Sequence, residues 1–209
     1  MAVVSNIESF RGVVRISVDG RRLAGVKSAF FQKLPLNVGD VIDEEEYLGR
    51  MAALQFPAAY EAALTMLDAS EHTSGEIVSS LKRKGFVEAA ALAAAERLKE
   101  NRLIDDARYA RRLAESKGGK AGAYAIRRKL RGKGLSEEHI ELAMECVSEE
   151  SQLSGARSAA EKLLGRYAGG DPRAVRAKLG QALARRGYGW DVINQAVESL
   201  LDGEDWYGD

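Results

Sequence analysis

The sequence contains little cysteine, little proline and few aromatic residues. Its 209 residues include one cysteine, Cys146, and three prolines, and aromatic residues make up 7%. A single cysteine excludes an intramolecular disulfide framework and a cysteine-built zinc site. No stretch approaches ~18 uninterrupted apolar residues, and the N-terminus lacks the basic and apolar regions of a signal peptide. We therefore expect a cytoplasmic protein that does not bind membranes.

Excess charge of either sign is also absent from the chain as a whole, because 31 Lys and Arg residues balance 31 Asp and Glu residues. The balance is not local. The segment Arg108–Lys133, here called the basic segment, carries ten basic residues and one acid, Glu115, and so has a net charge of +9. The compensating acids lie elsewhere, at Asp43–Glu46 and in residues 202–209. A concentrated basic stretch favours an anionic partner, which the overall charge would not suggest.

The N-terminal part has the pattern of a small α+β head. Apolar and polar residues alternate over Val14–Val18, as in a half-buried strand. Asp19-Gly20 is typical of a tight hairpin turn, and Leu23–Val26 can return as the second strand. Asp43–Glu46 then places acids in the first turn of a helix. We expect the head to pack on the following helices, either as a structural cap or as a docking element.

The rest of the chain is helical in character and contains an internal repeat marked by Gly85, Gly134 and Gly187. Each glycine follows apolar residues at i and i+4 and then basic residues: Ile77 and Leu81, Ile126 and Leu130, Leu179 and Leu183. This spacing predicts a helix with one apolar face, ended by a glycine in the left-handed conformation. A second helix is predicted after each glycine, with these inward residues: Ala91, Leu92, Ala95, Leu98; Ile140, Met144, Val147; Ile193, Val197, Leu200.

The predicted fold is therefore mainly α, with three tandem three-helix repeats stacked in an elongated array behind an α+β head that contains a β-hairpin. Each repeat is too small for a comfortable core of its own, which favours stacking. The predicted boundaries are 1–57 for the head, 58–103, 104–148 and 149–201 for the repeats, and 202–209 for an acidic tail.

Three motifs in this order resemble the RecX family. Leu103-Ile104-Asp105-Asp106-Ala107-Arg108-Tyr109-Ala110 is similar to the family's LIDD-x-R-[YF]-A segment. The pattern from Gly122 through Ile126 and Leu130 to Leu135 is similar to its G-xxx-I-xxx-L-xx-KG-[IL] helix, and Leu183–Ile193 resembles its C-terminal L-x-RRG-[FY]-xx-[DE]-VI. The resemblance covers residues 60–201 and implies a curved array of three-helix repeats.

The resemblance also implies a function. RecX proteins bind the bacterial recombinase RecA, particularly its filament on DNA, and restrain strand exchange, ATP hydrolysis and co-protease activity. It thus implies a role in homologous recombination, DNA repair and the SOS response. RecA and its nucleoprotein filament are the expected partners, with weak DNA binding in addition.

The basic segment is the candidate partner-binding site. Its basic residues are Arg108, Arg111, Arg112, Lys117, Lys120, Arg127, Arg128, Lys129, Arg131 and Lys133. At ~100° per residue, Arg128 points away from the apolar face set by Ile126 and Leu130. A merely solvated face is the alternative, but like charges one turn apart repel, which favours a binding role. A direct DNA-binding module and a generic helical scaffold remain the alternative functions.

The other candidate sites have weaker support in the sequence. Gly118-Gly119-Lys120 lacks P-loop spacing, and His72 and His139 lack metal-ligand spacing and are expected on helix surfaces. Cys146, Tyr188 and Trp190 are expected in the core, and Asp105 and Asp106 at the start of a helix. No nucleophile, base and orienting group come together in the sequence. We therefore expect no enzyme activity, cofactor, metal or small-molecule substrate.

Overall fold

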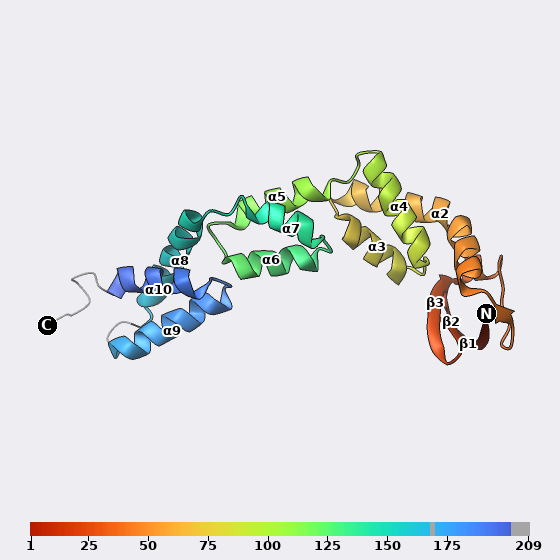
Figure 1. The fold of residues 1–209 in the computed structure, drawn as a ribbon, viewed down its shortest axis with the longest axis horizontal. Coiled ribbons are helices and arrows are strands. Elements are labelled where there is room, and N and C mark those ends of the chain that lie inside the picture. Colours follow the sequence, from red (N-terminus) through yellow and green to blue (C-terminus); the bar gives the residue numbers. More distant parts are fainter. Residues whose placement is uncertain (168–169, 202–209) are drawn as a thin grey trace. The chain divides into compact units, whose positions relative to one another are not determined.

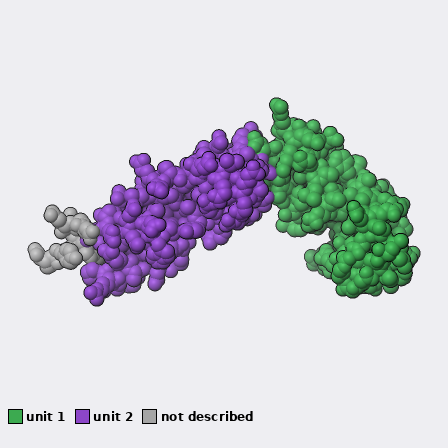
Figure 2. All heavy atoms as spheres, viewed as in Figure 1, with its two compact units in different colours: residues 1–105 green, residues 106–209 purple. Residues whose placement is uncertain are grey.

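The computed structural model describes residues 1–167 and 170–201, which divide into two compact units (Figure 2). Unit 1 is Met1–Asp105 and unit 2 is Asp106–Asp209. The acidic tail predicted at 202–209 lies outside the described residues.

Unit 1 begins with an antiparallel sheet of four strands in the order β3-β2-β1-β4 (Figure 1). The strands are β1 Ala2–Phe10, β2 Val13–Val18, β3 Arg21–Lys27 and β4 Val41–Ile42. The predicted Asp19-Gly20 turn joins β2 to β3, and both residues have positive φ, 47° and 77°. This is the backbone geometry that suits the twist of a two-residue hairpin.

Strand β1 was not predicted from the sequence. It pairs with β2 through a second tight turn at Arg11-Gly12, which has φ values of 50° and 77°. The sequence pattern misses it because only Ala2 and Val4 are buried, whereas most of the strand is exposed on both faces and does not alternate. The head is therefore a four-stranded sheet, larger than the predicted hairpin.

The sheet packs on the helix α2, Glu44–Ala69. Asp43 caps this helix by accepting a hydrogen bond from the Glu46 backbone N–H at 3.0 Å, and the acids of the first turn lie at its N-terminus as predicted. The helix continues without a break through residues 57 and 58, where the sequence pattern placed the end of the head. Strand residues and helix residues share one buried core, so the head is part of the fold of the first repeat.

Nine helices form three three-helix repeats in the described chain (Figure 1). Repeat 1 consists of α2, α3 Ser74–Arg83 and α4 Glu88–Glu100. Repeat 2 consists of α5 Asp106–Lys117, α6 Ala123–Gly132 and α7 Glu137–Met144, and repeat 3 of α8 Glu149–Leu164, α9 Pro172–Arg185 and α10 Trp190–Leu201. A short helix, α1 Ser28–Phe31, precedes β4.

The repeat pattern correctly predicts the turns and most of the core. Gly85, Gly134 and Gly187 all have positive φ, at 84°, 71° and 84°. The six residues at i and i+4 before these glycines are all buried. The prediction that Leu92 points inward is wrong, because Leu92 is 52% exposed. In α10, Leu201 is buried, whereas the pattern favoured Leu200. Repeats 2 and 3 each have a separate apolar core within unit 2.

Candidate partner-binding surface

The helices of repeat 2 pack around a small core and expose several cations of the basic segment. Ile126 and Leu130 of α6 are buried against α5 and α7, while Arg128 and Lys129 on the same helix are exposed. Arg111 on α5 is also exposed. None of these three cations forms an ion pair with a described acid. The helical period that buries Ile126 and Leu130 therefore leaves Arg128 and Lys129 exposed to solvent.

Two arginines of the segment are neutralised by helix α7. Arg127 pairs with Glu141, and Arg131 makes two hydrogen bonds to Glu137, from Nε to Oε1 at 2.6 Å and from Nη2 to Oε2 at 2.8 Å. The hydrogen bond from Arg131 lowers the pKa of the Glu137 carboxyl and raises the pKa of the guanidinium. The net charge of +9 counted along the sequence thus overstates the charge of this surface, because the compensating acids follow the segment.

Tyr109 brings the two ends of the segment together. Its ring lies 6.0 Å from Arg112 Cζ and 5.9 Å from Lys133 Nζ, within cation–π range. Arg112 stands on α5 and Lys133 follows α6, so one half-buried aromatic ring gathers cations from both helices. Arg108 is exposed on α5, which begins at Asp106 as the sequence predicted.

The remaining two cations lie at the other end of repeat 2. Lys117 is half-buried in the last turn of α5, and Lys120 is exposed in the linker to α6. The structure thus divides the ten predicted residues into a cluster around Tyr109, exposed cations on α5 and α6, two arginines paired with α7, Lys117 at the end of α5, and Lys120 beside repeat 3.

Repeat 3 caps the beginning of α6. No side chain of its own caps this helix. Instead, the N–H of Gly122 donates to Arg186 O at 3.1 Å, that of Tyr124 to Gly187 O at 3.0 Å, and that of Ala123 to Gln152 Oε1 at 2.7 Å. The first N–H groups of a helix have no partner within the helix, so these bonds satisfy them and join repeats 2 and 3.

The junction leaves a hollow of about 380 Å³ in unit 2, here called the cationic hollow. Lys120 lines it from the α5–α6 linker, Lys162 and Arg166 from the end of α8, and Arg186 from the end of α9. The last three residues were not predicted as site residues. Their sequence signal is weak, since basic residues in a last helical turn are ordinary, and only the folded junction brings them to Lys120.

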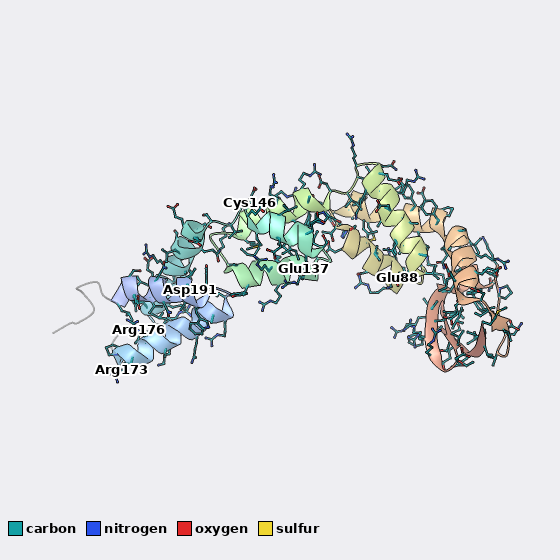
Figure 3. All side chains as sticks on the ribbon, in the orientation of Figure 1. Glu88, Glu137, Cys146, Arg173, Arg176 and Asp191 are labelled. Atoms are coloured by element: carbon teal, nitrogen blue, oxygen red, sulfur yellow. The ribbon has the colours of Figure 1, made fainter. Side chains whose placement is uncertain are left out.

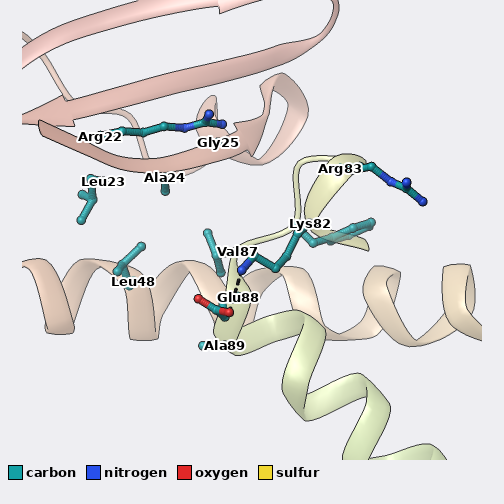
Figure 4. A pocket seen from close by; sticks show the side chains of 11 residues that line it. Arg22, Leu23, Ala24, Gly25, Leu48, Lys82, Arg83, Val87, Glu88 and Ala89 are labelled. Atoms are coloured by element: carbon teal, nitrogen blue, oxygen red, sulfur yellow. Dashed lines mark hydrogen bonds and ion pairs between the residues drawn. The ribbon is translucent and has the colours of Figure 1, made fainter. Parts of the chain in front are cut away.

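Unit 1 has a larger hollow, of about 520 Å³, lined by residues of β3, α2, α3 and α4 (Figure 4). Lys82 and Glu88 face each other there, with Nζ and Oε1 2.6 Å apart. The Arg131–Glu137 pair of repeat 2 occupies the same two positions, three residues before and three after the repeat glycine. This pairing is a second element of the repeat that the apolar pattern did not reveal.

Three predictions about single residues are wrong. Cys146 is exposed just after α7, not part of the core (Figure 3). Trp190 is 63% exposed because it stands at the start of α10, at the position that Glu88 and Glu137 occupy in the other repeats, whereas Tyr188 is buried as predicted. His72 lies in the loop before α3, not on a helix; His139 lies on α7.

The described residues contain no group of three or more His, Cys, Asp or Glu side chains arranged to hold a metal ion. Nor is any helix among them long and apolar enough to cross a bilayer. The surface carries exposed lysines and arginines on helices, and such residues are suited to binding an anionic partner.

Fold and surface together define a class: a helical-repeat protein with exposed cations on its helices. The three repeats match three family models, described as the first, second and third three-helix domains of RecX, over residues 59–98, 105–144 and 149–197. The chain belongs to the RecX family of regulatory proteins.

Similar curated proteins have the printed name "Regulatory protein RecX". That of Chlorobium phaeobacteroides is 32% identical over 72% of this chain and 99% of its own length. That of Clostridium botulinum strain Alaska E43 is 26% identical over 91% of both chains. That of Geobacillus sp. strain WCH70 is 30% identical over 80% of this chain, which spans 62% of the Geobacillus protein.

Two crystal structures are also similar. One, described as regulatory protein RecX, has a TM-score of 0.62 and 28% identity, covering 93% of this chain and 98% of the other. The second, RecX from Lactobacillus salivarius, has a TM-score of 0.64 and 26% identity, covering 71% of this chain and 97% of the other. They support the fold of three-helix domains.

Proposed function

We propose that this protein binds RecA and its filament on DNA in the cytoplasm and inhibits the recombinase, ATPase and co-protease activities. It would thereby restrain homologous recombination and the SOS response. It acts by binding and not by catalysis. Family membership supports the identity of the partner. The single observation that supports the surface is the exposed cations of repeat 2, Arg111, Arg128 and Lys129, on a helix pair held by its own core.

The sequences of the three repeats also support the exposed cations of α6 as a binding surface. The three residues between the apolar anchors of α6 are Arg127, Arg128 and Lys129, whereas the matching residues of α3 are Val78, Ser79 and Ser80. In α9 they are Gly180, Gln181 and Ala182. The core does not require basic residues at these positions, since two of the three repeats fold without them. Their presence in repeat 2 favours a binding role.

The test is charge reversal where no intramolecular ion pair is lost. Arg128→Glu with Lys129→Glu should reduce inhibition of RecA's DNA-dependent ATPase by at least about tenfold in the concentration required, because each reversal replaces attraction by repulsion. The matched control, Arg83→Glu with Lys84→Glu, makes the same charge change on exposed residues of repeat 1. Co-sedimentation with RecA alone, DNA alone and the filament identifies the bound species.

Undiminished inhibition by the Arg128/Lys129 variant, with helical content intact, would remove this face from the binding site. Absence of inhibition by the unaltered protein would overturn the proposed function itself. Binding to bare DNA as tight as binding to the filament would favour the direct DNA-binding module instead.

A further inference from the structure

The cationic hollow gathers four positive charges without a counter-charge. None of Lys120, Lys162, Arg166 and Arg186 forms an ion pair with an acid in the described residues, and no acid lines the hollow. Arg186 is held in place by a hydrogen bond from Nη1 to Ala182 O at 3.0 Å. Four neighbouring cations repel one another, so an anion bound among them would stabilise the arrangement.

A buried hydroxyl lies behind this hollow. Tyr188 is 3% exposed, and its Oη has no hydrogen-bond partner among the described residues. A Cβ placed on Gly155, which lines the hollow, would lie 3.0 Å from that oxygen and 2.6 Å from Gly119 O. The Tyr188 hydroxyl therefore lies close to Gly155, one of the residues that line the hollow. Burial raises the pKa of Tyr188, so the hydroxyl stays protonated and able to donate.

Two exposed aromatic rings lie beside the turn from Arg186 to Gly189, which follows α9. Tyr124 is 68% exposed and Trp190 is 63% exposed. Trp190 follows Arg186 by four residues, and Tyr124 Cε2 lies 3.8 Å from the position of a Cβ on the intervening Gly189. Exposed rings next to a positively charged groove are typical of surfaces that bind single-stranded nucleic acid, since bases stack on the rings while cations follow the backbone.

We propose that the cationic hollow binds one phosphodiester group of a single-stranded nucleic acid, with Tyr124 and Trp190 placed to stack on its bases. The guanidinium forks of Arg166 and Arg186 match the paired oxygens of a phosphate. The aromatic rings favour a nucleic acid over an acidic peptide. The inference deepens the proposed function, because Lys120 belongs to both surfaces and the filament contains a DNA strand.

The experiment measures binding of a fluorescent (dT)15 oligonucleotide, without RecA, across a range of NaCl concentrations. The hollow variant carries Lys162→Ala and Arg166→Ala. The matched control carries Arg157→Ala and Arg173→Ala, which remove the same charge from exposed positions of the same repeat outside the hollow. Neither pair belongs to the residues proposed to contact RecA.

The hollow variant should bind (dT)15 about tenfold more weakly at ~100 mM salt. The magnitude of its slope of log affinity against log salt should decrease by about 0.7, the value for one phosphate of a single strand. The control should change the affinity less than about threefold. Trp190→Ala should weaken binding with no change in slope, since stacking releases no counterions.

Equal affinities and slopes for the hollow variant and the control would overturn the inference. So would an unaltered protein that fails to bind (dT)15 at low salt. Loss of RecA inhibition in the hollow variant with unchanged oligonucleotide affinity would assign the hollow to protein carboxylates and also overturn it. Inhibition of RecA's ATPase by the unaltered protein is measured separately, so a failure of the hollow is distinguishable from a failure of the proposed function.

Discussion

The glycine turns of repeats 1 and 3 have the same conformation but different neighbours. Gly85 and Gly187 both have a φ of 84° and both end the second helix of a repeat. The Gly85 carbonyl accepts a hydrogen bond from Lys27 N at the end of strand β3, at 2.8 Å. The Gly187 carbonyl accepts one from Tyr124 N at the start of α6. The same glycine turn therefore bonds to a strand of the sheet in unit 1 and to the start of another repeat in unit 2.

The difference extends to how the second helix of each repeat begins. In α3, Thr73 and Glu76 form a capping box, so the helix satisfies its own first N–H groups. In α6 the corresponding groups are satisfied by repeat 3. Helix α3 therefore carries its own start signal, whereas the start of α6 depends on a neighbour. Disruption of the junction should therefore affect α6 first.

The largest effect is expected from Gly187→Ala. A Cβ at Gly187 would lie 2.4 Å from Ala125 N, whereas a Cβ at Gly85 would lie 3.0 Å from Lys27 N. The left-handed conformation adds the same strain, about 1–2 kcal/mol, to both alanine variants. Overpacking against backbone should bring the total for Gly187→Ala to about 3 kcal/mol or more, and Gly85→Ala should cost less. Urea denaturation measures both.

Gly132→Ala is the control for these variants, because a Cβ there meets nothing within 4 Å and alanine suits a helix better than glycine. It should leave stability unchanged or raise it by up to about 1 kcal/mol. Equal losses for Gly85→Ala and Gly187→Ala would show that conformational strain dominates and that the closer contact at the repeat junction contributes nothing.

A second prediction concerns two buried glutamines. Gln55 bonds to Gly85 O at 3.2 Å and to Val87 N at 2.7 Å, all within unit 1. Gln152 of repeat 3 bonds to Gly118 O at 2.6 Å, to Ala121 O at 3.0 Å and to Ala123 N. Leucine at position 55 leaves the Val87 N–H without a partner, and leucine at position 152 does the same to the Ala123 N–H, each at a cost of about 2 kcal/mol.

The two variants should differ in where amide hydrogen exchange accelerates. Gln152→Leu should speed exchange at Ala123 while Leu130 in the same helix stays protected, because only the start of α6 loses its cap. Gln55→Leu should speed exchange throughout the core of unit 1. Gln181→Ala, at an exposed position of α9, is the control and should change neither. Uniform acceleration in the Gln152 variant would contradict the dependence of α6 on repeat 3.

The sequence predicts the helix ends and the core of each repeat, but not the contacts that join the repeats. The spacing around Gly85, Gly134 and Gly187 correctly predicted the helix ends and the buried pairs such as Ile126 and Leu130, because both follow from local periodicity. The exposure of Trp190 was missed, since the pattern does not say which apolar residues lie at a helix start. The hollow was missed because its cations come from three segments that meet only in the folded junction.

The basic segment illustrates a similar limit. Its ten cations end at Lys133, and the acids that pair with two of them lie beyond it. Glu137 and Glu141 follow within one helix, and the glycine turn folds them back onto Arg131 and Arg127. A count by segment treats residues as neighbours only if they are close in sequence, whereas a helical hairpin makes neighbours of residues six and fourteen apart. The site residues most worth testing are accordingly Arg128 and Lys129.

The smallest effect is expected from the ion pair that repeats 1 and 2 share and repeat 3 lacks. Ala184 and Trp190 replace the cation and the acid in repeat 3. Arg131 and Glu137 are both more than half exposed, so their pair contributes little to stability. Because the pKa of Glu137 is lowered in the folded state, its contribution is present above the ordinary pKa of a glutamate and is lost as pH falls through the folded value.

The melting temperature of Glu137→Gln should therefore lie slightly below that of the unaltered protein at neutral pH, and the two should converge in acid. Glu138→Gln removes the same charge one residue along and should show no such convergence. The difference should shrink at high salt, because exposed charges are screened. A gap between Glu137→Gln and the unaltered protein that widens in acid would reverse the sign expected of a lowered carboxyl pKa and contradict the pairing.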